Sequence, residues 1–243
     1  LTMLIDTGYS NSYFEDVIAS FHPYIDYVKF GWCTSMITPD INAKITFAKR
    51  HDVNVVMGGT FFEKALLQGS LDKFIEHLKS LKVSHLEISN GTVNLSNPDK
   101  AKYIKSFSGE FTVFSEVGFK DNTRSMELHP AKWLEYINQD LEAGAQKVIL
   151  EAREDGKGGI CRSDGEIRFG LINEIATAGI QASDLIFEAP NKTLQTYFIK
   201  HFGANANMAN IAFSDIIGLK TLRLGLRSDT LLMFEATSVA SPI

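Results

Sequence analysis

Short apolar runs recur along the chain, and each is followed by a turn and by a segment with the apolar spacing of an amphipathic helix. Eight runs are present, with starts 24 to 37 residues apart. Each interval holds one strand, one helix and two loops, which is the repeating unit of a parallel sheet. The predicted strands are Met3–Ile5, Tyr27–Trp32, Val53–Met57, His85–Ser89, Phe111–Val117, Lys147–Ala152, Asp184–Ala189 and Met208–Phe213.

Residues that start and stop helices fall between these runs. Ser12 and Glu15 have the spacing of a capping box ahead of an apolar stripe. Pro39 stands where the first residue of the next helix is expected. Pro130 opens a longer helical stripe, and Gly144 closes it. The intervals therefore predict helices between all the strands.

Alternating strands and helices leave two architectures, a closed barrel and an open doubly wound sheet. An open sheet usually carries a glycine-rich dinucleotide turn after its first strand, but residues 6–10 read Asp-Thr-Gly-Tyr-Ser. Eight units in 243 residues match the usual size of a barrel, and no linker divides the chain. We therefore predict a single α/β domain over residues 1–243, a (β/α)8 TIM barrel.

Composition narrows the classes of function. The formal net charge of −5 argues against a nucleic-acid or anionic-membrane surface. No apolar stretch reaches the roughly 18 residues of a membrane span, and the first residues lack the features of a signal peptide. Two distant cysteines, Cys33 and Cys161, do not make a disulfide framework. We expect a cytoplasmic protein with reduced thiols that binds neither nucleic acid nor membrane.

Four predicted strands each carry a glutamate inside an apolar run. A charge in such a strand must be paired or must bind a cation, because burying it alone costs several kcal/mol. One of these acids on its own is explained by a structural ion pair with Lys29 or Arg153. Four acids at one barrel mouth instead suit Mg²⁺, which takes carboxylate oxygens. The four are Glu87, Glu116, Glu151 and Glu188.

Basic residues at the same strand ends favour an anionic ligand. Lys29, Lys120 and Arg153 are placed to hold a phosphate or a carboxylate, the arginine by a bidentate contact. Backbone amides of Gly58-Gly59-Thr60, at the start of a helix, offer a nest for an anion, although a plain tight turn is the alternative.

At these strand ends the sequence resembles the phosphosulfolactate synthase family. The matching segments keep their order from end to end and cover nearly the whole chain. Each is short, but together they are specific. They are Tyr27–Trp32 with Thr34-Ser35, Gly58–Glu63, Glu87–Thr92, Ser115–Gly118, Glu151–Glu154, Phe187–Pro190 and Gly225–Thr230.

The resemblance implies a (β/α)8 barrel that adds sulfite to phosphoenolpyruvate with Mg²⁺, a step of coenzyme M biosynthesis in methanogens. On this basis Glu116, Glu151 and Glu188 are candidate Mg²⁺ ligands, and Lys29 and Lys120 are candidate catalytic residues. Lys120 is our candidate for the donor of a proton to C2. Barrels of this kind often self-associate, so a homo-oligomer is an open expectation. The candidate substrate-binding residues are Asp6, Ser35, Gly59, Asn90, Ser115, Arg153, Asn207 and Arg227.

The sequence departs from the family pattern at three positions. Thr7 and Phe119 stand where the family usually has lysine, and Cys33 stands where it has glycine. Loss of positive charge weakens the binding of two anions, so the nucleophile is open. The alternatives are a paralogue that adds another nucleophile to phosphoenolpyruvate, a non-catalytic stress-associated protein, and an unrelated phosphate-binding barrel such as a Schiff-base aldolase.

Overall fold

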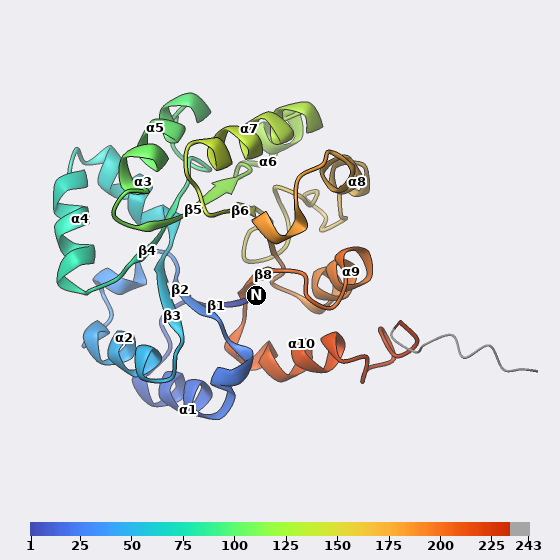
Figure 1. The fold of residues 1–243 in the computed structure, drawn as a ribbon, viewed down its shortest axis with the longest axis horizontal. Helices are drawn as coiled ribbons and strands as arrows, with labels where there is room; N and C mark the ends of the chain where they lie inside the picture. Colours follow the sequence, from blue (N-terminus) through green and yellow to red (C-terminus); the bar gives the residue numbers. More distant parts are fainter. Residues whose placement is uncertain (234–243) are drawn as a thin grey trace, which may run out of the picture.

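A closed barrel of eight parallel strands, joined in chain order, forms the centre of the molecule (Figure 1). The computed structural model describes residues 1–233, so the last ten residues of the predicted domain lie outside the described part. The predicted TIM barrel is confirmed. The strands are β1 (Thr2–Asp6), β2 (Tyr27–Phe30), β3 (Asn54–Met57), β4 (His85–Ile88), β5 (Thr112–Val117), β6 (Lys147–Leu150), β7 (Leu185–Glu188) and β8 (Met208–Ile211).

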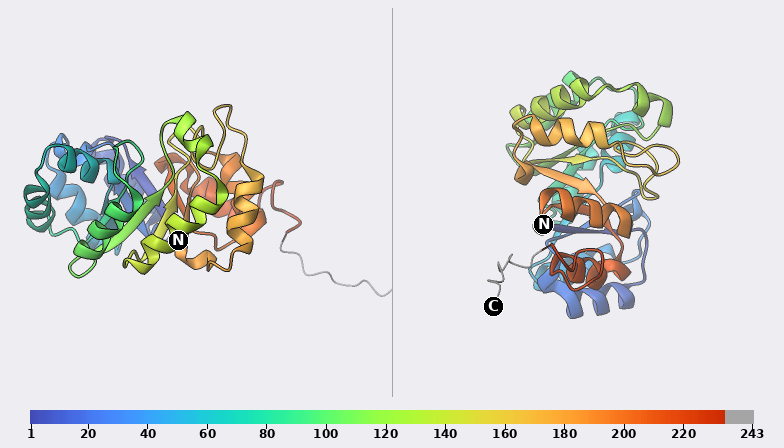
Figure 2. Two further views of the ribbon diagram at one scale, coloured as in Figure 1. Left: turned by 90° about the horizontal axis from the view of Figure 1, so that it is seen from above. Right: turned by 90° about the vertical axis from the view of Figure 1, so that its right-hand side faces the viewer.

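Helices surround the barrel and cover its outer face, as the views in Figure 2 show. The segment after β3 contributes two of them, α3 and α4. Helix α10 lies between α9 and α1 and completes the ring (Figure 1). The helices are α1 (Asn11–Phe21), α2 (Ile41–Arg50), α3 (Gly59–Leu67), α4 (Leu71–Ser80), α5 (Asn97–Phe107), α6 (Asn122–Glu127), α7 (Pro130–Glu142), α8 (Phe169–Thr177), α9 (Lys192–Phe202) and α10 (Ile216–Arg223).

Helix ends agree only partly with the signals in the sequence. Pro130 is the first residue of α7, and Gly144 follows its end with a positive φ of 109°. The predicted capping box of α1 is wrong, because Ser10 is the cap and its hydroxyl accepts from Tyr13 N. Helix α2 begins at Ile41 rather than at Pro39. A nearby serine therefore replaces the predicted cap of α1, and α2 starts two residues late.

Side chains inside the barrel form an apolar layer with a charged layer above it. Because side chains alternate along a strand, a residue two positions after an inward one also points inward. This second residue is Glu116 in β5, Glu188 in β7, and Glu151 directly after the end of β6. The charged layer thus lies one step nearer the C-terminal ends of the strands. The apolar layer consists of Met3, Val56, Phe114, Ile149, Ile186 and Ala209.

Two fully buried ion pairs lie in the layer between the barrel strands and the surrounding helices. Lys44 Nζ of α2 lies 2.7 Å from Asp6 Oδ2 at the end of β1. Lys100 Nζ of α5 lies 2.8 Å from Asp140 Oδ2 of α7. Lys100 also donates to the carbonyl oxygen of Glu116 at 2.7 Å. This contact ties the end of β5 to the helix layer and so helps to place Glu116.

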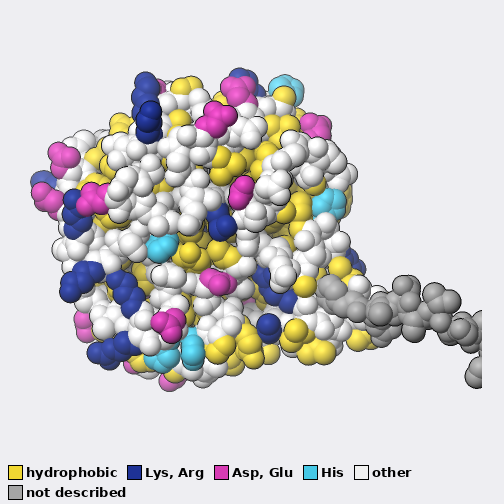
Figure 3. Space-filling model, viewed as in Figure 1, with side chains coloured by type: hydrophobic (Ala, Val, Ile, Leu, Met, Phe, Trp, Pro, Cys, Tyr) yellow, Lys and Arg dark blue, Asp and Glu magenta, His cyan; other side chains and the backbone are white. Residues whose placement is uncertain are grey.

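The charge on the surface and the length of the helices indicate whether the protein could bind nucleic acid or cross a membrane. On the face drawn in Figure 3, basic and acidic side chains lie interspersed, and no part of that face is covered by Lys and Arg alone. Within residues 1–233, every helix falls short of the length and apolar content that a bilayer crossing requires.

Candidate active site

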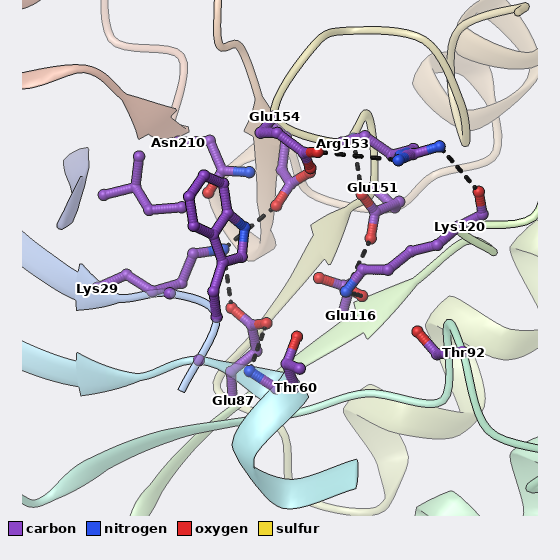
Figure 4. A pocket seen from close by; sticks show the side chains of 16 residues that line it. Lys29, Thr60, Glu87, Thr92, Glu116, Lys120, Glu151, Arg153, Glu154 and Asn210 are labelled. Atoms are coloured by element: carbon purple, nitrogen blue, oxygen red, sulfur yellow. Dashed lines mark hydrogen bonds and ion pairs between the residues drawn. The ribbon is translucent and has the colours of Figure 1, made fainter. Parts of the chain in front are cut away.

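A cavity of about 250 Å³ opens at the C-terminal ends of the strands, above the apolar layer (Figure 4). Ligand pockets for drug-sized molecules usually occupy about 300–1,000 Å³, so this cavity suits a small metabolite. The carboxyl ends of barrel strands are where such folds bind substrate. The structure brings together seven of the residues selected from the sequence, namely Lys29, Gly59, Glu116, Lys120, Glu151, Arg153 and Glu188.

Lys29 is a buried cation held by two carboxylates. Its Nζ lies 3.1 Å from Glu87 Oε2 and 3.2 Å from Glu188 Oε1. Burial opposes the charge of Lys29, but attraction to the two glutamates outweighs it and raises the pKa. Lys29 and the amide of Ala152 together lower the pKa of Glu188 against the effect of burial. Lys29 is therefore a fixed positive charge at the floor of the cavity.

Lys120 faces two further carboxylates but makes no hydrogen bond to them. Its Nζ lies 3.6 Å from Glu116 Oε1 and 3.7 Å from Glu151 Oε2 (Figure 4). Both of these oxygens are buried and lack a hydrogen-bond partner. The Lys120 side chain is 30% exposed, so its ammonium group reaches the cavity. The two open oxygens and the accessible ammonium are groups that a ligand can still engage.

Charge in the inner layer is not balanced. Glu87, Glu116, Glu151 and Glu188 oppose only Lys29 and Lys120, which leaves two surplus carboxylates. Burial raises the pKa of Glu116 well above its usual range, and the neighbouring Glu151 adds to this. Burial, together with Glu188, raises the pKa of Glu151 to about 7. The site therefore favours uptake of protons or of a cation.

The geometry accommodates Mg²⁺ with fewer protein ligands than the sequence indicated. Within residues 1–233, no three His, Cys, Asp or Glu side chains converge as a ready-made metal site. Mg²⁺ usually takes one or two carboxylates and completes its shell with water and substrate. The open oxygens of Glu116 and Glu151 fit that pattern. Both oxygens of Glu188 already accept, from Lys29 and from Ala152 N, so its geometry does not support the predicted ligand role.

A tight turn after β6 carries Arg153 to the rim of the cavity. Arg153 has a positive φ of 61°, and its amide donates to Glu151 Oε1 at 2.6 Å. Gly159 closes the turn, because a Cβ there would lie 1.8 Å from the carbonyl oxygen of Glu151. The guanidinium group lies 3.8 Å from Glu154 Oε1, and the Arg153 side chain is one-third exposed. Arg153 thus presents accessible donors for an anion.

The glycine pair after β3, Gly58-Gly59, makes its hydrogen bond to a carboxylate of the protein. Gly59 N donates to Glu87 Oε1 at 2.8 Å, so this amide is not free to bind an anion. Space also requires glycine at this position, because a Cβ would lie 2.3 Å from Ser89 Oγ. Thr60, the next residue, lines the cavity. The predicted anion nest is therefore occupied in part by a carboxylate of the barrel.

Three predicted substrate-binding residues point away from the cavity. Asp6 pairs with Lys44 in the helix layer. Ser115 alternates with Glu116 along β5, so it faces outward and donates to Asp140. Asn90 Nδ2 donates to the carbonyl of a residue in its own loop, Leu95. Asp6, Ser115 and Asn90 are therefore buried residues with hydrogen-bond partners in the protein, and none of them lines the cavity.

Three others also lie outside the cavity lining. Ser35 is buried in a short 3₁₀ turn after β2. Asn207 precedes β8 and therefore sits at the opposite end of the barrel, where its amide donates to the carbonyls of Ser183 and Leu185. Arg227 follows α10 and lies beside Gly218. Asn207 belongs to the start of a strand rather than to its end, and this places it away from the cavity.

Nine residues that line the cavity are not among the predicted site residues, namely Ile5, Gly31, Trp32, Gly58, Thr60, Glu87, Thr92, Glu154 and Asn210. The sequence places Glu87 among the four acids of the barrel mouth but gives it no site role. Strand alternation, two residues after the inward His85, agrees with its place in the cavity. Asn210 reaches the cavity through a positive φ of 57°, which alternation does not predict. Trp32 and Thr92 come from loops and Thr60 from the first turn of α3, and the sequence carries no specific signal for their side chains.

Comparison with known proteins places this geometry in a family. The family model described as (2R)-phospho-3-sulfolactate synthase matches residues 1–229. The chain belongs to the phosphosulfolactate synthase family. The phosphosulfolactate synthase of Bacillus subtilis is 51% identical over 229 residues, which cover 94% of this chain and 91% of that protein. The enzyme of the same name from Methanocaldococcus jannaschii is 38% identical over 95% of this chain and 93% of its own length.

Other similarities are weaker but informative about the fold and the alternatives. The 3-hexulose-6-phosphate synthase of Salmonella typhimurium, at 12% identity, covers 93% of this chain and 99% of its own with a TM-score of 0.58. Protein HEAT-STRESS-ASSOCIATED 32 of Arabidopsis thaliana is 23% identical over 88% of this chain and 81% of its own. The higher identity to named phosphosulfolactate synthases supports a lyase-type enzyme of this family.

Proposed function

We propose that this chain catalyses the Mg²⁺-dependent addition of sulfite to phosphoenolpyruvate, which yields 2-phospho-3-sulfolactate. The observation that carries the proposal is the pair of open carboxylates with Lys120 between them, at the mouth of a barrel of this family. The sulfur lone pair forms a bond to C3, and the electrons of the C=C bond move to C2 and into the substrate carboxylate. A proton must then reach C2, while the phosphate stays in place.

Lys120 is the group best suited to donate that proton. Its ammonium is accessible from the cavity, and attraction to Glu116 and Glu151 raises its pKa although burial opposes this. The raised pKa keeps Lys120 protonated before the reaction but makes it a weaker acid. Transfer to the carbanion is still favourable, because a carbanion is far more basic than an amine. In the metal-free protein both carboxylates lie within 4 Å of Lys120 Nζ. One donor on one side of C2 also provides for a single configuration of the product.

Glu116 and Glu151 would hold Mg²⁺ through their open oxygens. When bound, the metal stabilises negative charge as it develops on the substrate carboxylate. It also offsets the two surplus carboxylates of the inner layer, which otherwise repel two anionic substrates. Arg153, whose guanidinium is accessible, would bind the phosphate or the sulfite.

Two of the positions that depart from the family pattern, Thr7 and Phe119, lie outside the cavity lining. The ring of Phe119 packs against the guanidinium of Arg124 at 4.0 Å, so a cation remains next to this position. Lys29, Lys120 and Arg153 still line the cavity although the two other lysines are lost. This favours catalysis over the non-catalytic alternative. The cytoplasmic location and the homo-oligomer remain predictions.

The test is turnover of the purified protein. With Mg²⁺, phosphoenolpyruvate and sulfite together, we expect the ultraviolet absorbance of the enol to fall and phosphosulfolactate to appear by mass spectrometry. Omission of Mg²⁺ and addition of a chelator should abolish the change. Turnover with another nucleophile but not with sulfite would select the paralogue.

Ligand binding separates an inactive protein from a catalyst of another reaction. Mg²⁺ and phosphoenolpyruvate together should raise the melting temperature, because a ligand at about 100 times its Kd stabilises a protein by about 2.7 kcal/mol. The absence of both turnover and stabilisation would support the non-catalytic alternative. A Schiff-base aldolase would instead be trapped by borohydride with a carbonyl substrate.

A further inference from the structure

Glu63, on helix α3, is a carboxylate outside the cavity that accepts four hydrogen bonds although it is only 3% exposed. Its Oε1 accepts from the hydroxyl of Ser89 and from Gly91 N at 3.0 Å. Its Oε2 accepts from Thr92 N at 3.1 Å and from Val93 N at 3.0 Å. None of the ion pairs found within residues 1–233 includes Glu63.

A buried carboxylate without a cation depends on hydrogen-bond donors to replace water. Here three of the four donors are consecutive backbone amides, those of Gly91, Thr92 and Val93. The loop between β4 and α5 is thus wrapped around the Glu63 side chain. Without the carboxylate these amides lose their acceptor, and buried donors are rarely left unpaired. Glu63 therefore determines the conformation of residues 89–93.

The same loop holds the backbone of Lys120. Gly91 receives a hydrogen bond on its carbonyl oxygen from Lys120 N at 3.1 Å. A Cβ at Gly91 would lie only 3.3 Å from Glu116 Oε1 and 3.5 Å from Lys120 Cγ, so the loop packs closely on both side chains. A single residue, Gly91, thus connects the carboxylate of Glu63 to the main chain of Lys120.

We propose that Glu63 is a positioning residue that, through Gly91, holds Lys120 where its ammonium group lies between Glu116 and Glu151. The inference rests on the proposed function, in which Lys120 donates a proton to C2. Proton transfer requires close alignment, and a displacement of about 1 Å can slow a reaction about 100-fold. Glu63 does not touch the loop after β6 that carries Arg153. The link to Arg153 is a single long contact of 3.5 Å from its Nη1 to the carbonyl oxygen of Lys120, so we expect the anion contact to change less than the position of the Lys120 ammonium group.

Glu63→Gln tests this because it keeps the size of the side chain but removes the charge and two acceptor sites. We expect kcat to fall about tenfold or more, while KM for phosphoenolpyruvate changes by less than about threefold. Glu63→Asp keeps the charge on a shorter side chain. Its kcat should lie between those of the parent protein and of Glu63→Gln. A loss confined to KM, or a kcat within about twofold of the parent protein, would overturn the inference.

A matched control separates positioning from general loss of stability. Ile175→Val removes one methylene group from a buried side chain of α8, a helix that provides none of the donors to Glu63. Assayed below the melting temperature of both variants, it should keep the parent kcat. An equal loss of kcat in Ile175→Val would overturn the positioning role. If Glu63→Gln does not fold, Ser89→Ala removes one of the four donors and should lower kcat in the same direction by a smaller factor.

Hydrogen exchange tests the same link without turnover. In the substrate-free protein, Glu63→Gln should speed amide exchange at residues 91–93 and also at Lys120, whose amide is bonded to Gly91. Ile175→Val should leave both unchanged. Faster exchange at 91–93 with unchanged exchange at Lys120 would overturn the inference. Failure of the parent protein to turn over phosphoenolpyruvate and sulfite concerns only the proposed function, because the exchange result does not depend on it.

Discussion

Buried charges lie in two regions of this molecule, and the two regions differ in how the charges are matched. Between the barrel and its helices, Lys44 pairs with Asp6, and Lys100 pairs with Asp140, one cation to one anion. In the barrel mouth, four glutamates face two lysines. Oε1 of Glu116 and Oε2 of Glu151 have no hydrogen-bond partner there.

The difference separates structural charges from those that await a ligand. The lysines of the helix layer also donate to main-chain oxygens, of Tyr9 and of Glu116, so they connect elements as well as neutralise acids. The mouth has a surplus of negative charge and raised glutamate pKa values, which are unfavourable for stability in the absence of a ligand. Strained electrostatics of this kind are typical of functional sites.

The largest expected effect is on activity, in the mouth. Lys120→Met should lower kcat by about 10²–10⁴-fold, the usual contribution of a general acid, while the protein stays folded because this side chain is 30% exposed. Steady-state kinetics and the melting temperature measure the two effects. Lys132→Met, on the exposed surface of α7, is the control and should retain activity. A Lys120→Met variant with parental kcat would remove Lys120 from the mechanism.

In the helix layer the effect should fall on stability instead. Lys100→Met leaves Asp140 fully buried without its cation, and breaking a buried pair in this way costs about 3–5 kcal/mol. Urea denaturation measures the free energy of unfolding. The double variant Lys100→Met/Asp140→Leu removes both charges and should recover part of the loss. A loss below about 1 kcal/mol in the single variant would contradict the structural role.

Neutralising a mouth carboxylate should stabilise the protein in a way that depends on pH. Burial and Glu188 raise the pKa of Glu151 from about 4.5 to about 7, so the folded state binds a proton more tightly than the unfolded state. Stability that depends on this proton is present below about pH 4.5 and is lost as the pH rises to about 7. Glu151→Gln cannot lose a proton, and its advantage should grow over this range by up to about 3 kcal/mol.

Denaturation of the ligand-free protein at pH 5, 6, 7 and 8 measures this advantage. Glu127→Gln, on the surface, is the control and should follow the parent at every pH. The same Glu151→Gln protein should lose activity and affinity for Mg²⁺, if the metal binds as proposed. Parallel curves for Glu151→Gln and the parent would show that Glu151 is not under electrostatic strain.

Sequence patterns predicted the barrel because its signals are local and repeated. Apolar runs at regular intervals specified all eight strands, and the glutamates within them marked the inner layer. The step from strand to site was less reliable. Ser115 was chosen beside Glu116 although alternation turns neighbours to opposite faces, and Asn207 was chosen from the wrong end of β8. The alternation and the direction of each strand are enough to exclude Ser115 and Asn207 from the site.

Other parts of the site depend on long-range contacts that no local pattern encodes. The sequence predicts that a helix starts at Gly58-Gly59-Thr60, as α3 does, but it gives no sign of the role of Glu63 on that helix. The hydrogen bonds of Glu63 reach residues 26 to 30 positions away. Asn210 enters the cavity only through its left-handed backbone. Such features arise when the folded barrel closes, and the sequence holds no periodic signal for them.

The smallest expected effect comes from an ion pair of the same chemistry at the surface. Lys79 and Glu110 lie 2.7 Å apart, a shorter distance than that of either lysine in the mouth, yet both side chains are about half exposed. Water and salt screen such a pair, so Lys79→Ala should change the free energy of unfolding by less than about 1 kcal/mol. Urea denaturation at low and at 0.5 M salt measures it, and the small loss should shrink further in salt. A loss as large as that of Lys100→Met would mean that distance, rather than burial, sets the energy of these pairs, and the contrast between the two buried regions would lose its physical basis.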